Sequence, residues 1–280
     1  MSSFAGISLI DGNDGEAVDA GKFLIHGPQG TGKSRLASTI ARTGKTLFID
    51  LLGERGTRSF QGEPYAHNIQ IARPSSITAL DKLFWELDKG KHDFKAVVID
   101  SATSVQKMTM RYLMGHSETA VKEIQQGTAP ADQRTWGESL NVMTDLATFW
   151  FSLADGDRAE PMHVVMTAQT KVSENELTGT TSRHPDVQKG ALQIMLAAPD
   201  FVMYTDVEED MDAEDGKEQF QHIARFGANP DYRTKARIPA PLRGKLPSIL
   251  RGDNVDLSKL VRAMKLGGAQ PATPANKKKS

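Results

Sequence analysis

Short runs of successive apolar residues alternate along this chain with segments whose apolar residues recur every three or four positions. Runs that are apolar at consecutive positions are typical of parallel strands, because both faces of such strands are buried. The intervening spacing is typical of amphipathic helices that pack on a sheet. The pattern therefore predicts an α/β fold with one doubly wound, mostly parallel sheet. The strand-like runs cover residues 22–26, 46–50, 94–101 and 162–169, and the helical segments begin near residues 33, 76, 103 and 135.

Two further runs, at residues 201–207 and 219–226, flank an acidic turn and predict antiparallel strands at the edge of the sheet. The turn matches no calcium-binding spacing, so we interpret it as a solvated hairpin tip. Residues 115–134 and 170–188 are polar and weakly periodic, and we expect two long mobile loops there. Loops of that length are often functional. After the first of these loops, Thr135 and Glu138 have the spacing of a capping box, with Thr135 as the N-cap.

The chain divides into three parts. Residues 21–265 form the single predicted domain. Residues 1–20 are small, polar and acidic around an apolar patch, which either adds an edge strand or docks on a neighbouring subunit as an oligomerisation arm. Residues 266–280 are rich in Gly, Ala, Pro and Lys, a composition typical of a disordered basic tail.

The first strand leads directly into G-x-x-x-x-G-K-S, the pattern of a phosphate-binding loop. Backbone N–H groups of such a loop and of the helix that follows point at one anion. We expect Lys33 to reach the β- and γ-phosphates of a nucleoside triphosphate and the Ser34 hydroxyl to bind Mg²⁺. ATP and Mg²⁺ are the expected cofactors, with GTP left open. The predicted nucleotide-binding residues are Gly27, Pro28, Gln29, Gly30, Thr31, Gly32, Lys33, Ser34 and Arg35.

Two polar residues end apolar strands and are candidates for the same site. Asp100 follows four apolar residues, and an acid at this place in phosphate-loop enzymes holds Mg²⁺ beside the helix-start hydroxyl. Gln169 closes the run at 162–169, where the carboxyl end of a strand faces the ligand crevice. We expect Gln169 to sense the γ-phosphate or to orient water. The alternative for Asp100 is an aspartate that caps the next helix. The alternative for Gln169 is a strand-end amide without a role in catalysis.

Composition narrows the function further. The 34 basic and 35 acidic residues balance, so binding to nucleic acid would need a local basic patch. With no cysteine, the chain has neither a disulfide scaffold nor a thiol nucleophile. No apolar run approaches the ~18 residues of a membrane span, and the N-terminus lacks a signal pattern. We expect a soluble cytoplasmic protein.

The phosphate loop at 27–34, the strand that ends at Asp100, and Gln169 followed by a polar loop resemble the core of RecA-like P-loop ATPases. Within these, the chain is most similar to the phage Sak-type single-strand annealing group, over roughly residues 20–245. This resemblance implies a single RecA-like P-loop NTPase domain and a DNA-dependent ATPase that promotes annealing or homologous recombination. It also implies a homo-oligomer with ATP between subunits, located in the host cytoplasm, with a single-strand DNA-binding protein as a candidate partner.

The resemblance also suggests roles for particular residues. The loops at 115–134 and 170–188 would line a path for single-stranded DNA, with phosphate contacts from Lys171, Arg183, His184 and Lys189. In residues 231–237 three cations alternate along one face of a strand, and Lys235 would act in trans on the γ-phosphate of a neighbouring subunit. The alternative, for the loop cations and for those of residues 231–237, is that they are solvated surface charges without a binding role.

One departure concerns the residue that activates water. RecA-like proteins carry a glutamate two residues beyond the aspartate that ends the second strand, and here Leu52 occupies that place, after Asp50. Glu54, two residues further on, is the candidate substitute; the alternative is a base elsewhere in the chain. We expect nucleotide binding with slow turnover. Two other functions stay open. One is a small-molecule or nucleotide kinase, although such enzymes usually have an arginine-rich lid and here Arg55, Arg58 and Arg134 are scattered along the chain. The other is a non-hydrolysing NTP-dependent switch. An AAA+ motor is disfavoured because little chain follows residue 245 for a helical lid.

Overall fold

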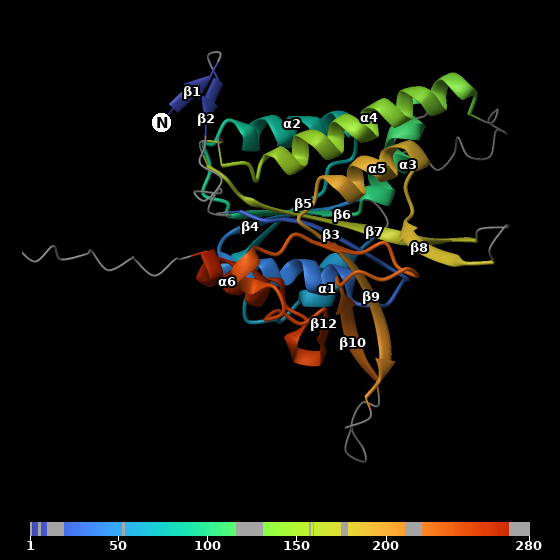
Figure 1. Ribbon diagram of the computed structural model, residues 1–280. Helices are drawn as coiled ribbons and strands as arrows, with labels where there is room; N and C mark the ends of the chain where they lie inside the picture. The colour runs from blue at the N-terminus through green and yellow to red at the C-terminus, as the bar shows by residue number, and fades with distance from the viewer. Residues whose placement is uncertain are drawn as a thin grey trace, which may run out of the picture.

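In the computed structural model, described residues are 2–4, 7–9, 20–51, 54–115, 131–156, 158, 160–174, 179–210 and 220–268. A large twisted sheet lies between two layers of helices (Figure 1). This architecture confirms the predicted α/β fold with a mostly parallel sheet and antiparallel edge strands.

Six strands of the sheet run parallel, and the phosphate-loop strand β3 lies in the middle between β9 and β7. The order across the sheet is β12-β10-β9-β3-β7-β6-β4-β5. The parallel strands are β3 (Lys22–Gly27), β4 (Thr46–Asp50), β5 (Ile69–Ala72), β6 (Ala96–Asp100), β7 (His163–Glu174) and β9 (Phe201–Glu209). The antiparallel strands are β10 (Phe220–Arg225), β12 (Ile249–Arg251), β11 (Lys235–Ala236), which pairs with β9, and β8 (Thr181–Pro185), which pairs with β7.

Helices cover both faces of the sheet because each strand buries alternate residues on opposite sides. In β3, Leu24 packs into the core under one helical layer, while Phe23 and Ile25 pack into the core under the other. The first layer holds α2 (Ile77–Asp88), α3 (Ala102–Leu113), α4 (Gln133–Ser152) and α5 (Lys189–Ala197). The second holds α1 (Lys33–Ser38), the 3₁₀ turn η1 (Thr39–Thr43) and α6 (Leu257–Gly268). Further 3₁₀ turns are η2 (Gly56–Phe60), η3 (Ala66–Asn68), η5 (Ala240–Leu242) and η6 (Gly252–Asn254).

The second predicted loop is wrong: residues 170–188 are not structureless. Strand β7 continues to Glu174 and turns back through β8, so the two strands form a hairpin that projects from the sheet (Figure 1). Its side chains lack a core-facing pattern because the hairpin extends beyond the core, and Val172 is 54% exposed. Most of the first predicted loop, residues 116–130, lies outside the described residues.

The predicted capping box is also wrong by one turn. Helix α4 begins at Gln133, and its N-cap is Asp132, whose carboxylate accepts a 2.7 Å hydrogen bond from the Thr135 backbone N–H. A carboxylate is an effective N-cap acceptor, and Asp132 stands one turn earlier. Glu138 forms an ion pair with Arg134 instead of reaching back to the cap.

The two ends of the chain differ from the rest. Strands β1 (Ser2–Phe4) and β2 (Ile7–Leu9) pair with each other in a small sheet of their own. Helix α6 reaches Gly268, three residues into the predicted tail, and the remainder of that tail lies outside the described residues. Within the described part of the chain, no helix is both long and apolar enough to cross a bilayer.

Candidate nucleotide-binding site

The phosphate loop leaves β3 at Gly27 and enters α1 at Lys33, as the sequence predicts. Gly30 and Gly32 have φ angles of 80° and 84°, a backbone region that favours glycine, so the loop can turn its N–H groups inward. Thr31 is buried; its hydroxyl donates to Pro28 O and also bonds Thr205 Oγ1 of β9, which ties the loop to a neighbouring strand. Pro28 and Gln29 are exposed, and so is Arg35, which pairs with Glu63 at 3.1 Å.

Lys33 lies under the loop. Its ammonium donates hydrogen bonds to the carbonyl oxygens of Gly27, at 2.9 Å, and Pro28, at 2.6 Å. Burial lowers the pKa of Lys33, while the negative charges of Asp100 and Glu54 act in the opposite direction. The cation is therefore desolvated and close to carboxylates, so a phosphate group at the loop would be a strong alternative partner.

Ser34 and Asp100 meet across the site, as predicted. The Ser34 hydroxyl donates to Asp100 Oδ2 at 2.7 Å, and the Thr167 hydroxyl of β7 donates to the other oxygen, Oδ1. Asp100 is 2% exposed, and burial raises its pKa although both hydroxyl hydrogen bonds act to lower it. Thr167 comes from the strand adjacent to β6, and its place in the sequence does not predict this role.

The donor set fits Mg²⁺, which prefers hard oxygen ligands and needs only one or two from the protein. Ser34 Oγ and the Asp100 carboxylate supply such oxygens side by side. Among the described residues no group of three or more His, Asp and Glu side chains is arranged to hold a metal ion. With Ser34 Oγ and the Asp100 carboxylate as its protein ligands, Mg²⁺ would take its other ligands from phosphate and water.

Gly56, the first residue of η2, covers this pair of ligands. A Cβ at Gly56 would overlap Asp100 Oδ2 and lie 2.7 Å from Ser34 Oγ. The φ angle here is not positive, so the glycine is required by closeness and not by backbone conformation. The sequence shows no signal for this role because the contact joins segments that are far apart in the chain.

Two acidic residues, at the end of β4 and shortly after it, lie beside Asp100. Glu54 Oε1 accepts hydrogen bonds from Ser101 Oγ, at 2.7 Å, and Ser104 Oγ, at 2.6 Å, next to Asp100. Asp50 ends β4 opposite Asp100 in register, and its Oδ2 pairs with Arg73 at 3.0 Å. Leu52, where a glutamate was expected, lies outside the described residues.

Gln169 lies directly beside Gly27 in the pairing of β7 with β3. Its backbone N–H donates to Thr103 Oγ1, at 3.0 Å, and its carbonyl accepts from the Asp186 N–H. The expectation that Gln169 ends its strand is wrong, since β7 passes through it into the hairpin. Position 169 nevertheless borders the phosphate loop, as expected.

Lys235 is not brought to the phosphate loop of its own chain. It pairs with Val202, which is level with Leu24 in the middle of β3. The Lys235 ammonium donates to Leu196 O and Ala197 O, each at 2.7 Å, at the C-terminal end of α5. Burial lowers the pKa of Lys235 to about 8. Among residues 231–237, only Lys235 and Ala236 form strand, so three cations do not share one strand face as predicted.

A cavity of about 160 Å³ adjoins the phosphate loop on the α1 side. His222 of β10 forms one wall, close to Gly32, and its Nδ1 is buried with no hydrogen-bond partner. The local sequence pattern around His222 does not predict that it lies near the phosphate loop. The other lining residues are Arg35, Thr39, Arg42, Glu63, Tyr65, Gly252, Asp253, Val255 and Asp256.

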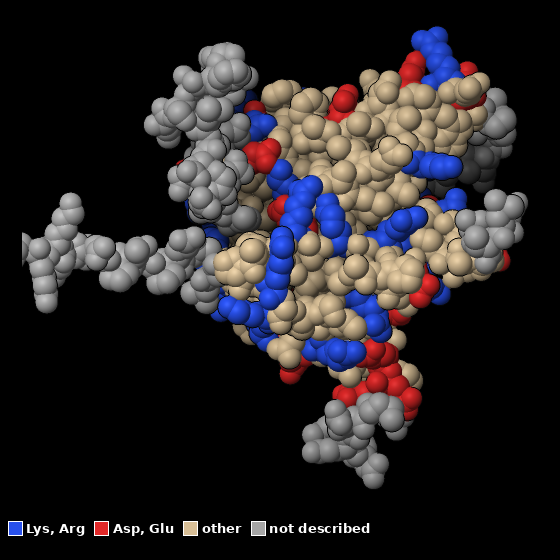
Figure 2. Space-filling model, viewed as in Figure 1, with Lys and Arg blue, Asp and Glu red and all other residues tan. Residues whose placement is uncertain are grey.

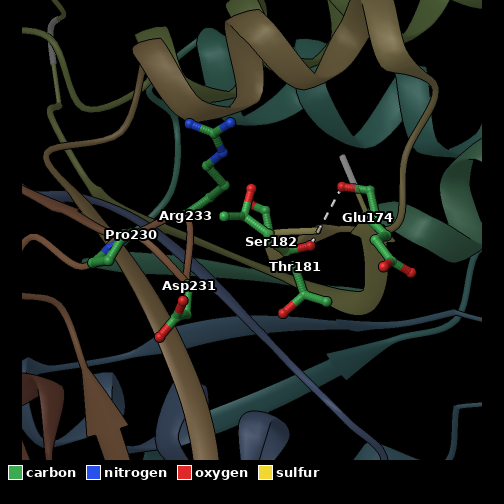
Figure 3. A pocket seen from close by; sticks show the side chains of 8 residues that line it. Glu174, Thr181, Ser182, Pro230, Asp231 and Arg233 are labelled. Carbon is green, nitrogen blue, oxygen red and sulfur yellow. Dashed lines mark hydrogen bonds between the residues drawn. The ribbon is translucent and has the colours of Figure 1, made fainter. Parts of the chain in front are cut away.

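The candidate DNA contacts surround the β7–β8 hairpin. Lys171 is exposed on β7, and Lys189 is exposed at the start of α5. His184 Nδ1 lies 3.0 Å from Pro185 O, and the Arg183 guanidinium lies 5.4 Å from the centre of the Tyr232 ring. A second cavity, of about 460 Å³, opens between the hairpin and residues 230–233 (Figure 3).

A buried phosphate-loop lysine, a helix-start serine bonded to a strand-end aspartate and a mostly parallel sheet define the class of P-loop NTPases. Within that class the chain belongs to the AAA domain family, whose family model matches residues 20–238. No curated protein matches the chain. The family supports nucleotide binding, and the geometry of Ser34 and Asp100 agrees with the Mg²⁺ dependence typical of such domains.

Proposed function

We propose that this chain is a RecA-like, Mg²⁺-dependent ATPase whose turnover responds to single-stranded DNA, acting in annealing or recombination as the phage Sak-type group does. One observation carries the proposal: β7 borders the phosphate loop at Gln169 and continues without a break into the exposed β7–β8 hairpin. A change at the γ-phosphate can therefore act on the hairpin through a single strand. Strand β7 thus connects the phosphate-binding site directly to the β7–β8 hairpin.

Each residue of the site has a defined task in hydrolysis. Lys33 would leave the carbonyl oxygens of Gly27 and Pro28 to bind phosphate oxygens. Ser34 and Asp100 would hold Mg²⁺, which neutralises phosphate charge when bound. Glu54 accepts the proton as a water oxygen bonds to the γ-phosphorus. The bond from that phosphorus to the bridging oxygen breaks, and its electron pair stays on ADP. The proton then passes to the released phosphate or to solvent.

The cavity beside α1 is the natural place for the nucleoside. It starts at Gly32 of the phosphate loop and continues along Arg35 and Thr39 of the following turns. His222 Nδ1, buried without a partner, offers a hydrogen bond to a sugar hydroxyl or a base. These groups suit either purine, so ATP is the proposed substrate on the ground of the resemblance.

In this scheme copies of the chain assemble with ATP between them. The exposed Pro28, Gln29 and Gly30 leave the phosphate loop open on one side, where a second copy can approach. A cation supplied by that copy would stabilise charge that develops on the γ-phosphate, and such residues accelerate hydrolysis by ~10³–10⁵-fold.

The test is hydrolysis of ATP by the wild-type chain and by Lys33→Ala, with and without an unstructured oligonucleotide. We expect turnover that rises with the oligonucleotide and disappears in the variant. A wild-type chain that binds ATP without hydrolysing it would identify an NTP-dependent switch. Hydrolysis that ignores the oligonucleotide would remove the DNA part of the proposal. Phosphoryl transfer to a nucleoside acceptor would identify a kinase.

A further inference from the structure

Residues 225–251 are strongly basic in a chain whose overall charge is balanced. This segment contains seven basic residues and one acidic residue, Asp231, whereas the whole chain has a net charge of −1. Local concentration of one sign of charge creates a field that the net charge conceals. The basic residues are Arg225, Arg233, Lys235, Arg237, Arg243, Lys245 and Arg251.

The segment lies along one side of the sheet. It leaves β10, passes the edge of β9 as β11, and returns through η5 to β12, which pairs with β10. In Figure 1 this orange part of the chain crosses the front of the molecule, and Figure 2 shows Lys and Arg side chains gathered over the same region. We call this surface the basic edge.

Four of its cations are held by ion pairs or by short hydrogen bonds within the chain, and Arg243 has only a 3.5 Å hydrogen bond, to Ile238 O. Lys235 and Arg237 donate to carbonyl oxygens at the end of α5, and Arg237 also pairs with Asp200. Arg225 and Arg251 both pair with Glu208. These contacts fix the segment against the rest of the fold. The remaining exposed cations are free of such ion pairs with the described residues.

The other three, Arg233, Arg243 and Lys245, are exposed, and none forms an ion pair with any carboxylate of the described chain. Arg233 and Asp231 point to opposite sides in Figure 3, so the single acid of the segment does not neutralise its neighbour. An exposed cation without a carboxylate partner keeps its full attraction for an external anion.

The basic edge is continuous with the hairpin. The backbone N–H of Arg233 donates to Arg183 O, at 2.8 Å, and the N–H of Arg183 donates to Asp231 O, also at 2.8 Å. The Tyr232 and Tyr204 rings pack at a tilt of 34°, with 4.3 Å between their centres, and the Arg183 guanidinium lies over the Tyr232 ring. These contacts hold residues 231–233 against β8. A polyanion bound to the hairpin can therefore extend onto the basic edge.

We propose that Arg233, Arg243 and Lys245 bind backbone phosphates of single-stranded DNA along the basic edge, independently of its sequence. The proposal rests on the proposed function, because it assigns a second contact surface to the same DNA. Separate cations on an extended surface suit a flexible chain of phosphates better than one compact anion. It adds a surface to the hairpin contacts that the family resemblance implies.

An anionic membrane is the main competitor for such a surface, and the structure disfavours it. Stable interfacial binding needs apolar side chains that insert among the lipids. None of the large exposed apolar residues in the described chain lies within residues 225–251. The basic edge presents charge without an apolar anchor.

The experiment measures binding of a labelled oligothymidylate to the full chain with ATP and Mg²⁺ over a range of salt concentrations. The test variant is Arg243→Glu with Lys245→Glu. The matched control is Lys82→Glu with Lys107→Glu, which makes the same change in net charge at exposed positions on α2 and α3. Basal ATP hydrolysis without DNA should stay unchanged in both, since none of the four residues belongs to the nucleotide site.

We expect the test variant to bind at least ~10-fold more weakly and the slope of log affinity against log salt to fall by about 1.4, since each lost phosphate contact on a single strand is worth about 0.7. The affinity of the control variant for the oligonucleotide should stay within about twofold of the wild-type affinity. Arg233→Gln should reduce the slope by about 0.7.

Four results would overturn the inference. Equal weakening in test and control variants would mean that only net charge matters. Wild-type affinity in the test variant would confine DNA to the hairpin and leave the proposed function intact. Binding of phosphatidylglycerol vesicles, lost in the test variant while oligothymidylate binding persists, would assign the edge to a membrane. A wild-type chain that hydrolyses ATP but does not bind the oligonucleotide would overturn this inference together with the DNA part of the proposed function.

Discussion

The Ser34 hydroxyl donates a 2.7 Å hydrogen bond to Asp100 Oδ2, although 66 residues separate the two in sequence. Ser34 lies in the first turn of α1, and Asp100 ends β6, two strands away from β3. The contact exists because parallel strands bring their carboxyl ends to the same edge of the sheet. It joins the two oxygen donors that a cation bridging to phosphate requires.

Asp100→Asn tests this pair directly. Burial raises the pKa of Asp100, so the folded chain holds the proton more tightly than the unfolded chain, and ionisation near neutral pH lowers folding stability. The amide removes that ionisation. We expect the free energy of unfolding without nucleotide to fall little or not at all at neutral pH, while Mg²⁺-dependent ATP affinity drops by roughly 10–100-fold.

Calorimetric titration of ATP with Mg²⁺ and with EDTA gives the readout. The variant and the wild type should bind equally in EDTA. The stability difference between variant and wild type should shift in favour of the variant as pH rises above 4. A Mg²⁺ dependence equal to that of the wild type would show that the cation is held elsewhere.

Gly56→Ala should damage the same site through volume alone. The added Cβ would overlap the Asp100 carboxylate, and overpacking of this kind costs about 1–3 kcal/mol. We expect weaker Mg²⁺-ATP binding and slower hydrolysis. Gly137→Ala on α4 is the control, because a Cβ there meets nothing within 4 Å. Kinetic measurements that show no difference between the two variants would mean that η2 moves away when nucleotide binds.

Glu54→Gln separates chemistry from binding. The amide oxygen can still accept from Ser101 and Ser104, so the local hydrogen bonds survive, but the side chain can no longer take a proton. We expect the turnover rate to fall ~10²–10⁴-fold, the range for loss of a general base. The KM for ATP should stay close to wild type. Unchanged turnover would exclude Glu54 as the base and direct attention to Asp50, which ends β4 beside Asp100.

Two buried histidines predict acid sensitivity. Burial lowers the pKa of His26 and of His163 from 6.5 to about 4. As the pH falls through 6.5 the unfolded chain takes up protons first, so stability is lost from there down to about pH 4. The loss is on the order of 3 kcal/mol for each histidine, at 1.36 kcal/mol per pKa unit. Urea unfolding at pH 7.5, 6 and 5 measures it.

His163→Gln should flatten this pH dependence, because glutamine does not titrate. The variant loses stability at pH 7.5, since His163 Nδ1 accepts the Gly21 N–H at 2.8 Å, but the difference from wild type should shrink as the pH falls. His67 is exposed, and His67→Gln is the control that should leave the dependence unchanged. Parallel curves for wild type and His163→Gln would contradict the assignment.

The parts of the fold that could be predicted have local causes. Consecutive apolar residues at 96–99 need a strand buried on both faces, and the spacing from Gly27 to Ser34 needs a loop around an anion. The end of β6 at Asp100 followed from the same pattern, whereas β7 runs past the predicted end at Gln169. The β7–β8 hairpin escaped prediction because its strands face solvent and lack alternation, as the exposed Val172 shows.

The remaining site residues depend on contacts between distant segments. Thr167 is one polar residue in an apolar strand, and only its position beside β6 makes it a donor to Asp100. In the sequence Gly56 resembles any loop glycine, and only the fold places it against Ser34 and Asp100. His222 comes from an antiparallel strand far along the chain. No local pattern encodes such neighbours, since they arise from the order of strands in the sheet.

Lys235 has two interpretations that one variant distinguishes. Within the chain its ammonium binds the last carbonyl oxygens of α5, an interaction of about 0.3–1 kcal/mol for a cation at a helix C-terminus. If that is its whole role, Lys235→Ala should lower the free energy of unfolding by roughly this amount and leave turnover unchanged. If it acts in trans on the γ-phosphate, turnover should fall while ATP binding persists.

Arg237→Ala is the matched variant, because Arg237 donates to the same helix end through Ala197 O, at 2.7 Å. Equal small losses of stability with normal turnover in both variants would make the pair a structural clamp on α5. A loss of turnover confined to Lys235→Ala would require Lys235 to leave the helix end when copies assemble. Mixing Lys235→Ala with Lys33→Ala then decides the matter, since a trans residue from one copy and an intact phosphate loop from the other restore one working site per mixed interface.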